Sequence, residues 1–218
     1  MKKHFILLIM TAFVCTLSLN AQSPEVLKAK EILDKVAAKT KAYPAIRADF
    51  SFMIENLQAN ITETFSGTIT IKGGKYKAEL MDIETYFDGT TLWTYMPDAN
   101  EVNISDASMM EDDMLDPASV FTIYEKDFKY IHASEETING KKVDVIDLFP
   151  DKRDKPFSRI KLYIYRDNLQ FAKISQIGKD GTNYIIDIKK MNVNTSFEDS
   201  FFRFDTSKHQ GVVVIDLR

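Results

Sequence analysis

The chain has 218 residues, of which 44% are hydrophobic and 28% are charged, with only 8 glycines and 6 prolines. This composition is typical of a folded protein and excludes a disordered or collagen-like chain. The net charge of −4 excludes the general basic surface that binds nucleic acid. A single cysteine excludes a disulfide framework and a cysteine-based zinc site, and three histidines leave little material for a catalytic metal centre.

The beginning of the chain has the three-part pattern of a secretory signal peptide. A basic start precedes an apolar run over residues 5–19, and the run is followed by the small residue Ala21. The run is short for a membrane span, which needs about 20 apolar residues, so a cleaved leader is favoured over an anchor. Cys15 follows a bulky valine inside the run, which favours its loss with the leader over lipid attachment. We predict a signal peptide at 1–21 and a single exported domain at 22–218.

A helix is predicted directly after the leader. Ser23 is a capping residue, and Pro24 suits the first helical position. Apolar residues then recur at helical spacing, namely Val26, Ala29, Leu33, Val36 and Ala37. The Tyr43-Pro44 pair ends the pattern, so the amphipathic helix is expected over residues 24–41.

From Ile46 onward the apolar residues alternate with polar ones, which is typical of half-buried strands. Tight turns separate the alternating segments, and Asn139-Gly140 is the strongest hairpin signal in the chain. Gly67 inside a strand predicts a bulge or a bend that helps the sheet to curl. About eleven strands joined by short turns are expected to pair antiparallel with their neighbours.

The strands are interrupted between Ser105 and Phe128, where two short helices are predicted. This region holds Met109, Met110 and Met114. Because methionine adapts to irregular partners, these residues fit either a mobile lid over an apolar ligand or a gap-filling part of the core. The adjacent acidic triplet lacks the alternating oxygens and the glycine of a calcium loop.

These elements predict an α+β fold that is mainly β, with a single curled antiparallel sheet capped by the N-terminal helix and a helical lid. So many antiparallel strands curl into a barrel or split into a sandwich, and a large curled sheet tends to enclose a cavity. Alternation along the strands predicts the side chains that line this cavity: Phe50, Phe52, Tyr76, Ala78, Trp93, Tyr95, Ile160, Leu162 and Ile164. Under the lid we place Met110, Met114, Val120 and Phe121.

Two features limit these assignments. A slip of one residue turns every side chain of a strand over, so Trp93 and Tyr95 fit the outer face equally well. The sequence contains no Gly-x-Ser-x-Gly, phosphate loop or His-Glu-x-x-His motif, and His132 and His209 fit structural or surface roles. We therefore expect no catalytic residue, no metal site and no cofactor.

Several segments match a known family in the same order along the chain. They are Ala48-Asp49-Phe50, Phe65-x-Gly67-x-Ile69-x-Ile71-Lys72, Phe87-Asp88-Gly89-x-Thr91-Leu92-Trp93-x-Tyr95-x-Pro97, Asp116-Pro117-Ala118 and Phe201-x-x-Phe204. On these residues the chain resembles the LolA-like family of periplasmic outer-membrane lipoprotein carriers. The Asp-Gly-x-x-Leu-Trp-x-Tyr block is the most specific of the segments.

The resemblance implies an incomplete barrel of eleven strands with a helical lid and an apolar cavity that holds the acyl chains of a lipoprotein. It further implies a monomeric periplasmic carrier, an inner-membrane donor complex and an outer-membrane acceptor. One departure concerns an arginine that in the family follows the Ile-Lys of the second strand, where this chain has Gly73-Gly74. Lys72 or Lys75 could substitute, but lysine is a poor copy of a planar guanidinium, so we do not expect an arginine latch.

Three alternatives to a lipoprotein carrier remain open at this stage. The first is a lipid or glycolipid transfer protein, and the second is an envelope sensor or adaptor domain with a stable protein partner. The third is an enzyme on the same fold, which would need polar groups that converge inside the cavity.

Overall fold

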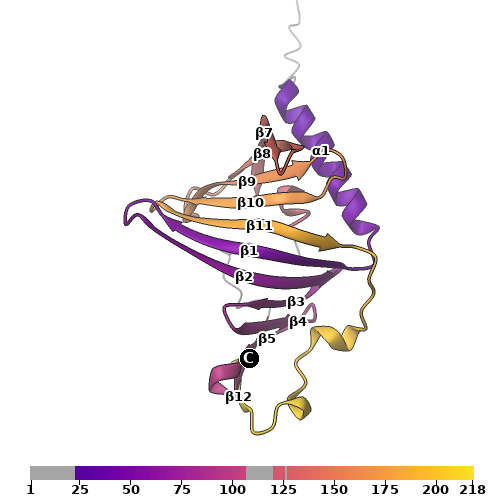
Figure 1. The fold of residues 1–218 in the computed structure, drawn as a ribbon, viewed down its shortest axis with the longest axis vertical. Coiled ribbons are helices and arrows are strands. Elements are labelled where there is room, and N and C mark those ends of the chain that lie inside the picture. Colours follow the sequence, from indigo (N-terminus) through magenta and orange to yellow (C-terminus); the bar gives the residue numbers. More distant parts are fainter. Residues whose placement is uncertain (1–22, 107–119, 126) are drawn as a thin grey trace, which may run out of the picture.

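The computed structural model of the protein describes residues 23–106, 120–125 and 127–218. The predicted signal peptide and the predicted lid residues Met110 and Met114 lie outside the described residues. Figure 1 shows one large sheet with a long helix, α1 (Pro24–Lys41), beside one end of it. Within the described ranges, no helix is long and apolar enough to cross a membrane.

The sheet contains twelve strands, one more than expected from the sequence. In chain order they are β1 (Ile46–Asn56), β2 (Ile61–Lys72), β3 (Lys75–Leu80), β4 (Ile83–Phe87), β5 (Thr91–Met96), β6 (Glu101–Asp106), β7 (Phe128–Ile138), β8 (Lys141–Pro150), β9 (Phe157–Tyr165), β10 (Phe171–Gly178), β11 (Thr182–Asn192) and β12 (Val213–Asp216). Short 3₁₀ helices lie at η1 (Pro97–Ala99), η3 (Ile123–Glu125), η4 (Asp199–Phe202) and η5 (Thr206–Lys208).

The strand order is β12-β6-β5-β4-β3-β2-β1-β11-β10-β9-β8-β7. Eleven strands pair antiparallel, as predicted, whereas β12 pairs parallel to β6. The strands β12 and β7 form the two ends of this order, so the curled sheet does not close. The fold is therefore an incomplete barrel, which confirms the predicted class.

The helix α1 begins and ends where the sequence predicts. The Ser23 hydroxyl accepts a hydrogen bond from the Val26 amide at 3.4 Å, and Pro24 occupies the first turn. Its buried stripe, Ala29, Leu33, Val36 and Ala37, packs on Ile146, Leu148, Ile160, Leu162, Ile164, Phe171 and Ile174 of β8, β9 and β10. We call the face of the sheet that carries these residues the helix face.

The helix face continues across the sheet to β5. Phe50 of β1 is paired with Ile188 of β11, which contacts the α1 core. Ile46 has the same parity as Phe50 along β1 and begins a row of cross-strand neighbours, Ile46, Ile71, Tyr76, Phe87 and Leu92. Phe121 packs against both the α1 core and this row, so the two apolar clusters lie on the same face.

The bulge predicted at Gly67 is absent from the pairing of β1 with β2, whereas the alternative of a bend stays a prediction. The pairing of β1 with β2 runs without interruption through Gly67, and the register shift of β1 lies between Asp49 and Phe50 opposite β11. A Cβ at Gly67 would lie 2.6 Å from the Phe50 ring and 2.9 Å from the Glu79 carbonyl oxygen. Glycine is required here because the Phe50 ring lies directly over the backbone.

The opposite face of β4–β6 is covered by the C-terminal segment. Phe204 packs with Tyr86, Tyr95 and Val102, and its ring centroid lies 4.8 Å from that of Tyr95. Earlier in the same segment, the Asp199 carboxylate binds the ammonium groups of Lys72 and Lys75 at 2.9 and 2.6 Å. The C-terminal segment therefore gives the sheet a second apolar layer on the side away from α1.

Candidate functional site

A pocket of about 480 Å³ lies between the C-terminal end of α1, the segment 120–125 and the helix face of β1–β4. Its lining residues are Ala37, Thr40, Lys41, Tyr43, Ala45, Ile46, Ile71, Gly73, Gly74, Phe87, Phe121 and Thr122. The volume falls within the range of roughly 300–1,000 Å³ that small-molecule pockets occupy. We call this the seam pocket, because it lies where the two apolar clusters of the helix face meet.

The interior of the seam pocket is apolar. Ile46, Ile71 and Phe87 are buried, and they form one hydrophobic cluster with Tyr76. The rings of Tyr76 and Phe87 lie 5.4 Å apart at a tilt of 42°. These side chains come from neighbouring strands in direct register, so the sheet itself fixes their positions.

Phe121 forms the side of the pocket that faces the α1 core. Its ring stacks on that of Phe171 with centroids 5.2 Å apart and planes within 6° of parallel. Because Phe121 contacts both apolar clusters, it separates the pocket from the packed core under α1. Among the described residues that line the seam pocket, Phe121 is the only one that the sequence predicted for the cavity or the lid.

Thr40 and Lys41 at the end of α1 and Gly73 and Gly74 of the β2–β3 turn also line the pocket, and we call these four residues its rim. A Cβ added at either glycine would meet nothing within 4 Å. Gly73 has φ of +57°, which favours glycine, whereas Gly74 lies outside the left-handed region. A side chain at Gly74 would therefore extend freely at the rim.

The predicted cavity residues fall into three groups in the structure. Phe50, Phe52, Tyr76 and Ala78 lie on the helix face but do not line the seam pocket, so their place in a ligand cavity stays a prediction. Ile160, Leu162 and Ile164 also point to the helix face, but α1 covers them and they are at most 1% exposed. They are therefore core residues, and their assignment to a cavity lining is corrected.

The predicted placement of Trp93 and Tyr95 in the cavity is wrong, because both lie on the face of the sheet opposite to the helix face. Leu92 lies on the helix face, so its neighbour Trp93 points away from it, and Tyr95 follows Trp93 in parity. Both pack in the cluster with Tyr86 and Phe204 on the opposite face. In this strand Leu92 faces the helix side, so the predicted set of inward-facing residues is shifted by one position.

The lid set is described only in part. Val120 is buried in the α1 core and Phe121 lies beside it, while Met110 and Met114 lie outside the described residues. Lys72 and Lys75, the candidates for a latch, both bind Asp199, and Lys72 also donates to the Phe197 carbonyl at 2.8 Å. Their contacts thus tie down the C-terminal segment instead.

Sequence reasoning missed most of the seam pocket. The alternating pattern places Ile46, Ile71 and Phe87 in strands, but the predicted cavity set does not include them. Ile46 has the same parity as Phe50 along one strand, and this parity indicates that the two side chains share a face. Ala37 and Tyr43 carried no such signal, because their role depends on where the end of α1 lies against the sheet.

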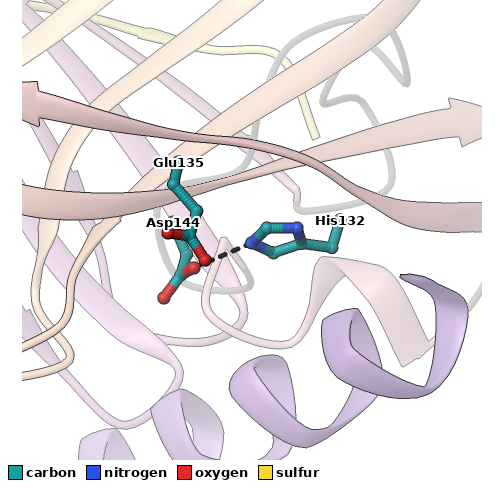
Figure 2. Close-up of side chains that lie close together, drawn as sticks. All are labelled: His132, Glu135 and Asp144. Atoms are coloured by element: carbon teal, nitrogen blue, oxygen red, sulfur yellow. Dashed lines mark hydrogen bonds and ion pairs between the residues drawn. The ribbon is translucent and has the colours of Figure 1, made fainter. Parts of the chain in front are cut away.

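A charged cluster lies beneath the first turns of α1, and Figure 2 shows three of its members, His132, Glu135 and Asp144. His132 Nε2 lies 2.7 Å from Asp144 Oδ1, and Arg166 Nε and Nη2 donate to Asp144 at 3.0 and 2.7 Å. Lys28 of α1 donates to Glu135 at 2.8 Å and lies 3.6 Å from Asp144. Arg166 also contacts Glu135.

The charged cluster does not fit a metal ion. One ligand atom from each of His132, Glu135 and Asp144 lies within 4.8 Å of the others. However, hydrogen bonds from Arg166 and Lys28 lower the pKa of Glu135 to about 2. Burial raises the pKa of Asp144, but the hydrogen bonds from Arg166 and His132 outweigh it and the pKa is lowered. Both carboxylates are thus already neutralised, and the cluster fastens α1 to β7 and β8.

A second pocket, of about 510 Å³, is lined by Lys30, Asp34, Tyr124, Glu125, Phe128 and Tyr130. Its central carboxylate is engaged, since Lys30 lies 2.6 Å from Asp34 and the Tyr124 hydroxyl donates to Asp34 at 3.0 Å. Three charged side chains make this pocket a poorer environment for an acyl chain than the seam pocket. The seam pocket is therefore the better candidate site.

Comparisons with solved structures bear on the fold. A DUF1329 family protein from Desulfovibrio piger matches at a TM-score of 0.51 and 13% identity, over 86% of this chain and 100% of that chain. An uncharacterized conserved protein from Thermus thermophilus matches at a TM-score of 0.57 and 12% identity, over 87% of this chain and 99% of that chain. A LolA superfamily protein from Nitrosomonas europaea gives a TM-score of 0.45 at 13% identity, over 82% and 98% of the two chains. The first two show a shared fold.

Sequence comparison identifies the family. No curated protein sequence matches the chain. Residues 17–149 match the profile of the family described as outer membrane lipoprotein carrier protein LolA. This match spans more than half of the chain, including β1–β7, most of β8 and most of the segments that carry the resemblance. The chain therefore belongs to the LolA family of outer membrane lipoprotein carrier proteins.

Proposed function

We propose that this protein is a non-catalytic periplasmic carrier, exported by a cleaved signal peptide, that shields acyl chains in the seam pocket. The observation that carries the proposal is the pocket itself, which has an apolar interior and an open polar rim in a chain of the LolA family. The cargo is the acylated part of a lipoprotein. The carrier collects it from an inner-membrane donor complex and releases it to an outer-membrane acceptor.

The physical need for such a carrier follows from the hydrophobic effect. Each methylene exposed to water costs about 0.8 kcal/mol, so a lipoprotein does not cross an aqueous compartment without a shield. Ile46, Ile71 and Phe87 offer an apolar surface that replaces water around the chain. Delivery then requires the carrier to hold its cargo less tightly than the acceptor does, and a monomer with an open rim suits rapid exchange.

Lipid or glycolipid transfer is a second candidate function, and the Gly73-Gly74 rim favours it. With no Cβ at either position, the pocket opens beside the turn and leaves room for a bulky head group. Both functions use the same apolar interior and differ in what the acyl chain is attached to. An experiment on acyl-chain binding therefore tests the feature they share.

Blocking the rim tests this proposal. We expect Gly74→Phe to weaken binding of a fluorescent 16-carbon acyl probe by about tenfold or more, because the new ring narrows the opening to the pocket. The backbone of Gly74 lies outside the left-handed region and its Cβ meets no atom, so the thermal unfolding midpoint should stay close to that of the parent. Probe fluorescence titration and a thermal melt measure the two effects.

Ala99→Phe is the matched control, because Ala99 lies in the exposed η1 turn away from the pocket. It adds the same ring and should leave probe affinity unchanged. If Gly74→Phe binds the probe as tightly as the parent does, acyl chains do not enter at this rim and the proposal is wrong.

A further inference from the structure

The seam pocket is amphipathic, and among its described lining residues the single charged one lies at the rim. Lys41, the last residue of α1, lines the pocket together with Thr40, Gly73 and Gly74. The interior residues Ile46, Ile71, Phe87 and Phe121 carry no polar atom in their side chains. A ligand that matches this arrangement has one apolar chain and a charged or polar head group.

The ammonium group of Lys41 is loosely held. The carboxylate oxygen with which it pairs, Glu125 Oε1, lies 3.9 Å away, and the two side chains are 69% and 46% exposed. Such an ion pair contributes little to stability and exchanges readily for another partner. An incoming anion could therefore take the place of Glu125 without breaking a strong contact.

Lys41 is the cation of this rim, because Lys72 and Lys75, which flank the Gly73-Gly74 turn, point to the opposite face of the sheet and bind Asp199 there. The negative end of the α1 macrodipole opposes an anion here, but Lys41 itself lies in the last turn and offsets it. Lys41 thus supplies the positive charge at the rim of a chain whose net charge is −4.

We propose that the seam pocket selects single-chain amphiphiles with an anionic head group, carboxylate or phosphate, and that Lys41 contacts the head group at the rim. The inference rests on the acyl-chain site of the proposed function and, of the two candidate functions, it deepens lipid transfer, whose ligands carry such head groups. The chain lies against Ile46, Ile71 and Phe87, and the head group displaces Glu125 from Lys41.

The test compares three 16-carbon probes that differ only in their head groups, namely hexadecyl sulfate, hexadecanol and hexadecyltrimethylammonium, all kept below their micelle concentrations. Each displaces a neutral fluorescent acyl probe from the parent protein. The expected order of affinity is sulfate, then alcohol, then ammonium, with about a fivefold gap between the first and the last. Hexadecanoate and hexadecyl phosphate, titrated separately, then show whether a fatty acid or a phosphate head group binds more tightly.

Two charge-reversal variants test whether the preference for an anionic head group depends on Lys41. Lys41→Glu should reverse the order of sulfate and ammonium. Lys39→Glu is the matched control, because Lys39 lies one half-turn earlier in α1 and donates to the Asn168 carbonyl at 2.8 Å, outside the pocket lining. It changes the net charge equally and should leave the order unchanged.

The outcomes separate this inference from the proposed function. If all three probes bind the parent with equal affinity, the anion preference is wrong and the acyl-chain site stands. If Lys39→Glu shifts the order as much as Lys41→Glu does, the contact assigned to Lys41 is wrong. If none of the probes binds to the parent, the proposed function itself is wrong.

Discussion

Replacing Phe121 with glutamate is expected to weaken acyl-probe binding by about tenfold or more. The aromatic ring forms one side of the seam pocket and stacks on Phe171 at 5.2 Å. A carboxylate in this position faces the apolar interior and must either be desolvated by the incoming chain or keep water in the pocket. Either course removes free energy from binding, and a fluorescence titration with a 16-carbon acyl probe measures the loss.

Phe121→Leu is the control for this change. Leucine keeps an apolar contact with both clusters, so we expect it to retain most of the parent affinity. A thermal melt of each variant shows whether the fold is intact. Parent-like probe affinity in a folded Phe121→Glu protein would mean that the segment 120–125 does not contact the ligand.

The second large effect concerns stability. Leu162→Ala is expected to lower the free energy of unfolding by about 2–5 kcal/mol, because truncating a buried leucine leaves a cavity in a packed core. Leu162 is 1% exposed, lies between Ile146 and Ile174 in the sheet, and belongs with them to the core packed on α1. Urea unfolding followed by circular dichroism measures the change.

Leu27→Ala is the matched substitution, because Leu27 lies on α1 but is 54% exposed. Its effect on unfolding should stay within about 0.5 kcal/mol. Acyl-probe affinity should be unchanged in both variants at temperatures where they are folded. Loss of probe binding in folded Leu162→Ala, with little change in stability, would mean that β9 lines the ligand site instead of the core.

The elements of this fold were predictable because their signals are local. Ser23-Pro24 marks the start of α1, and the Asn139-Gly140 turn joins β7 to β8 with both residues at positive φ. Alternation located the strands, and short turns implied antiparallel pairing. The parallel pairing of β12 with β6 brings together residues that are far apart in sequence, so no local pattern predicts it.

The parity of β5 was not predictable from that strand alone. Large side chains lie on both of its faces, with Leu92 on the helix face and Trp93 and Tyr95 on the opposite one. The opposite face is apolar because Phe204, from the C-terminal segment, covers it. The usual rule that one face of an antiparallel sheet meets water therefore gave no guidance.

The boundary between the packed core and the seam pocket was also not predictable from the sequence. Alternation placed Leu162 and Phe50 on the correct face, but it carries no information on where α1 crosses that face. The helix lies over β8–β10 and leaves the β1–β4 end to the seam pocket. The position of one helix thus decides which apolar residues are core and which are available to a ligand.

The most direct test of an acyl-chain site is native mass spectrometry, with lipid extraction, on the protein purified from its native cells. The account predicts a bound species that carries an acyl chain, and its loss from Gly74→Phe prepared in the same way. Co-purified lipoprotein would identify the cargo of a carrier, and a free lipid would indicate transfer. A protein that is empty on purification and takes up no added acyl chain would contradict the central claim.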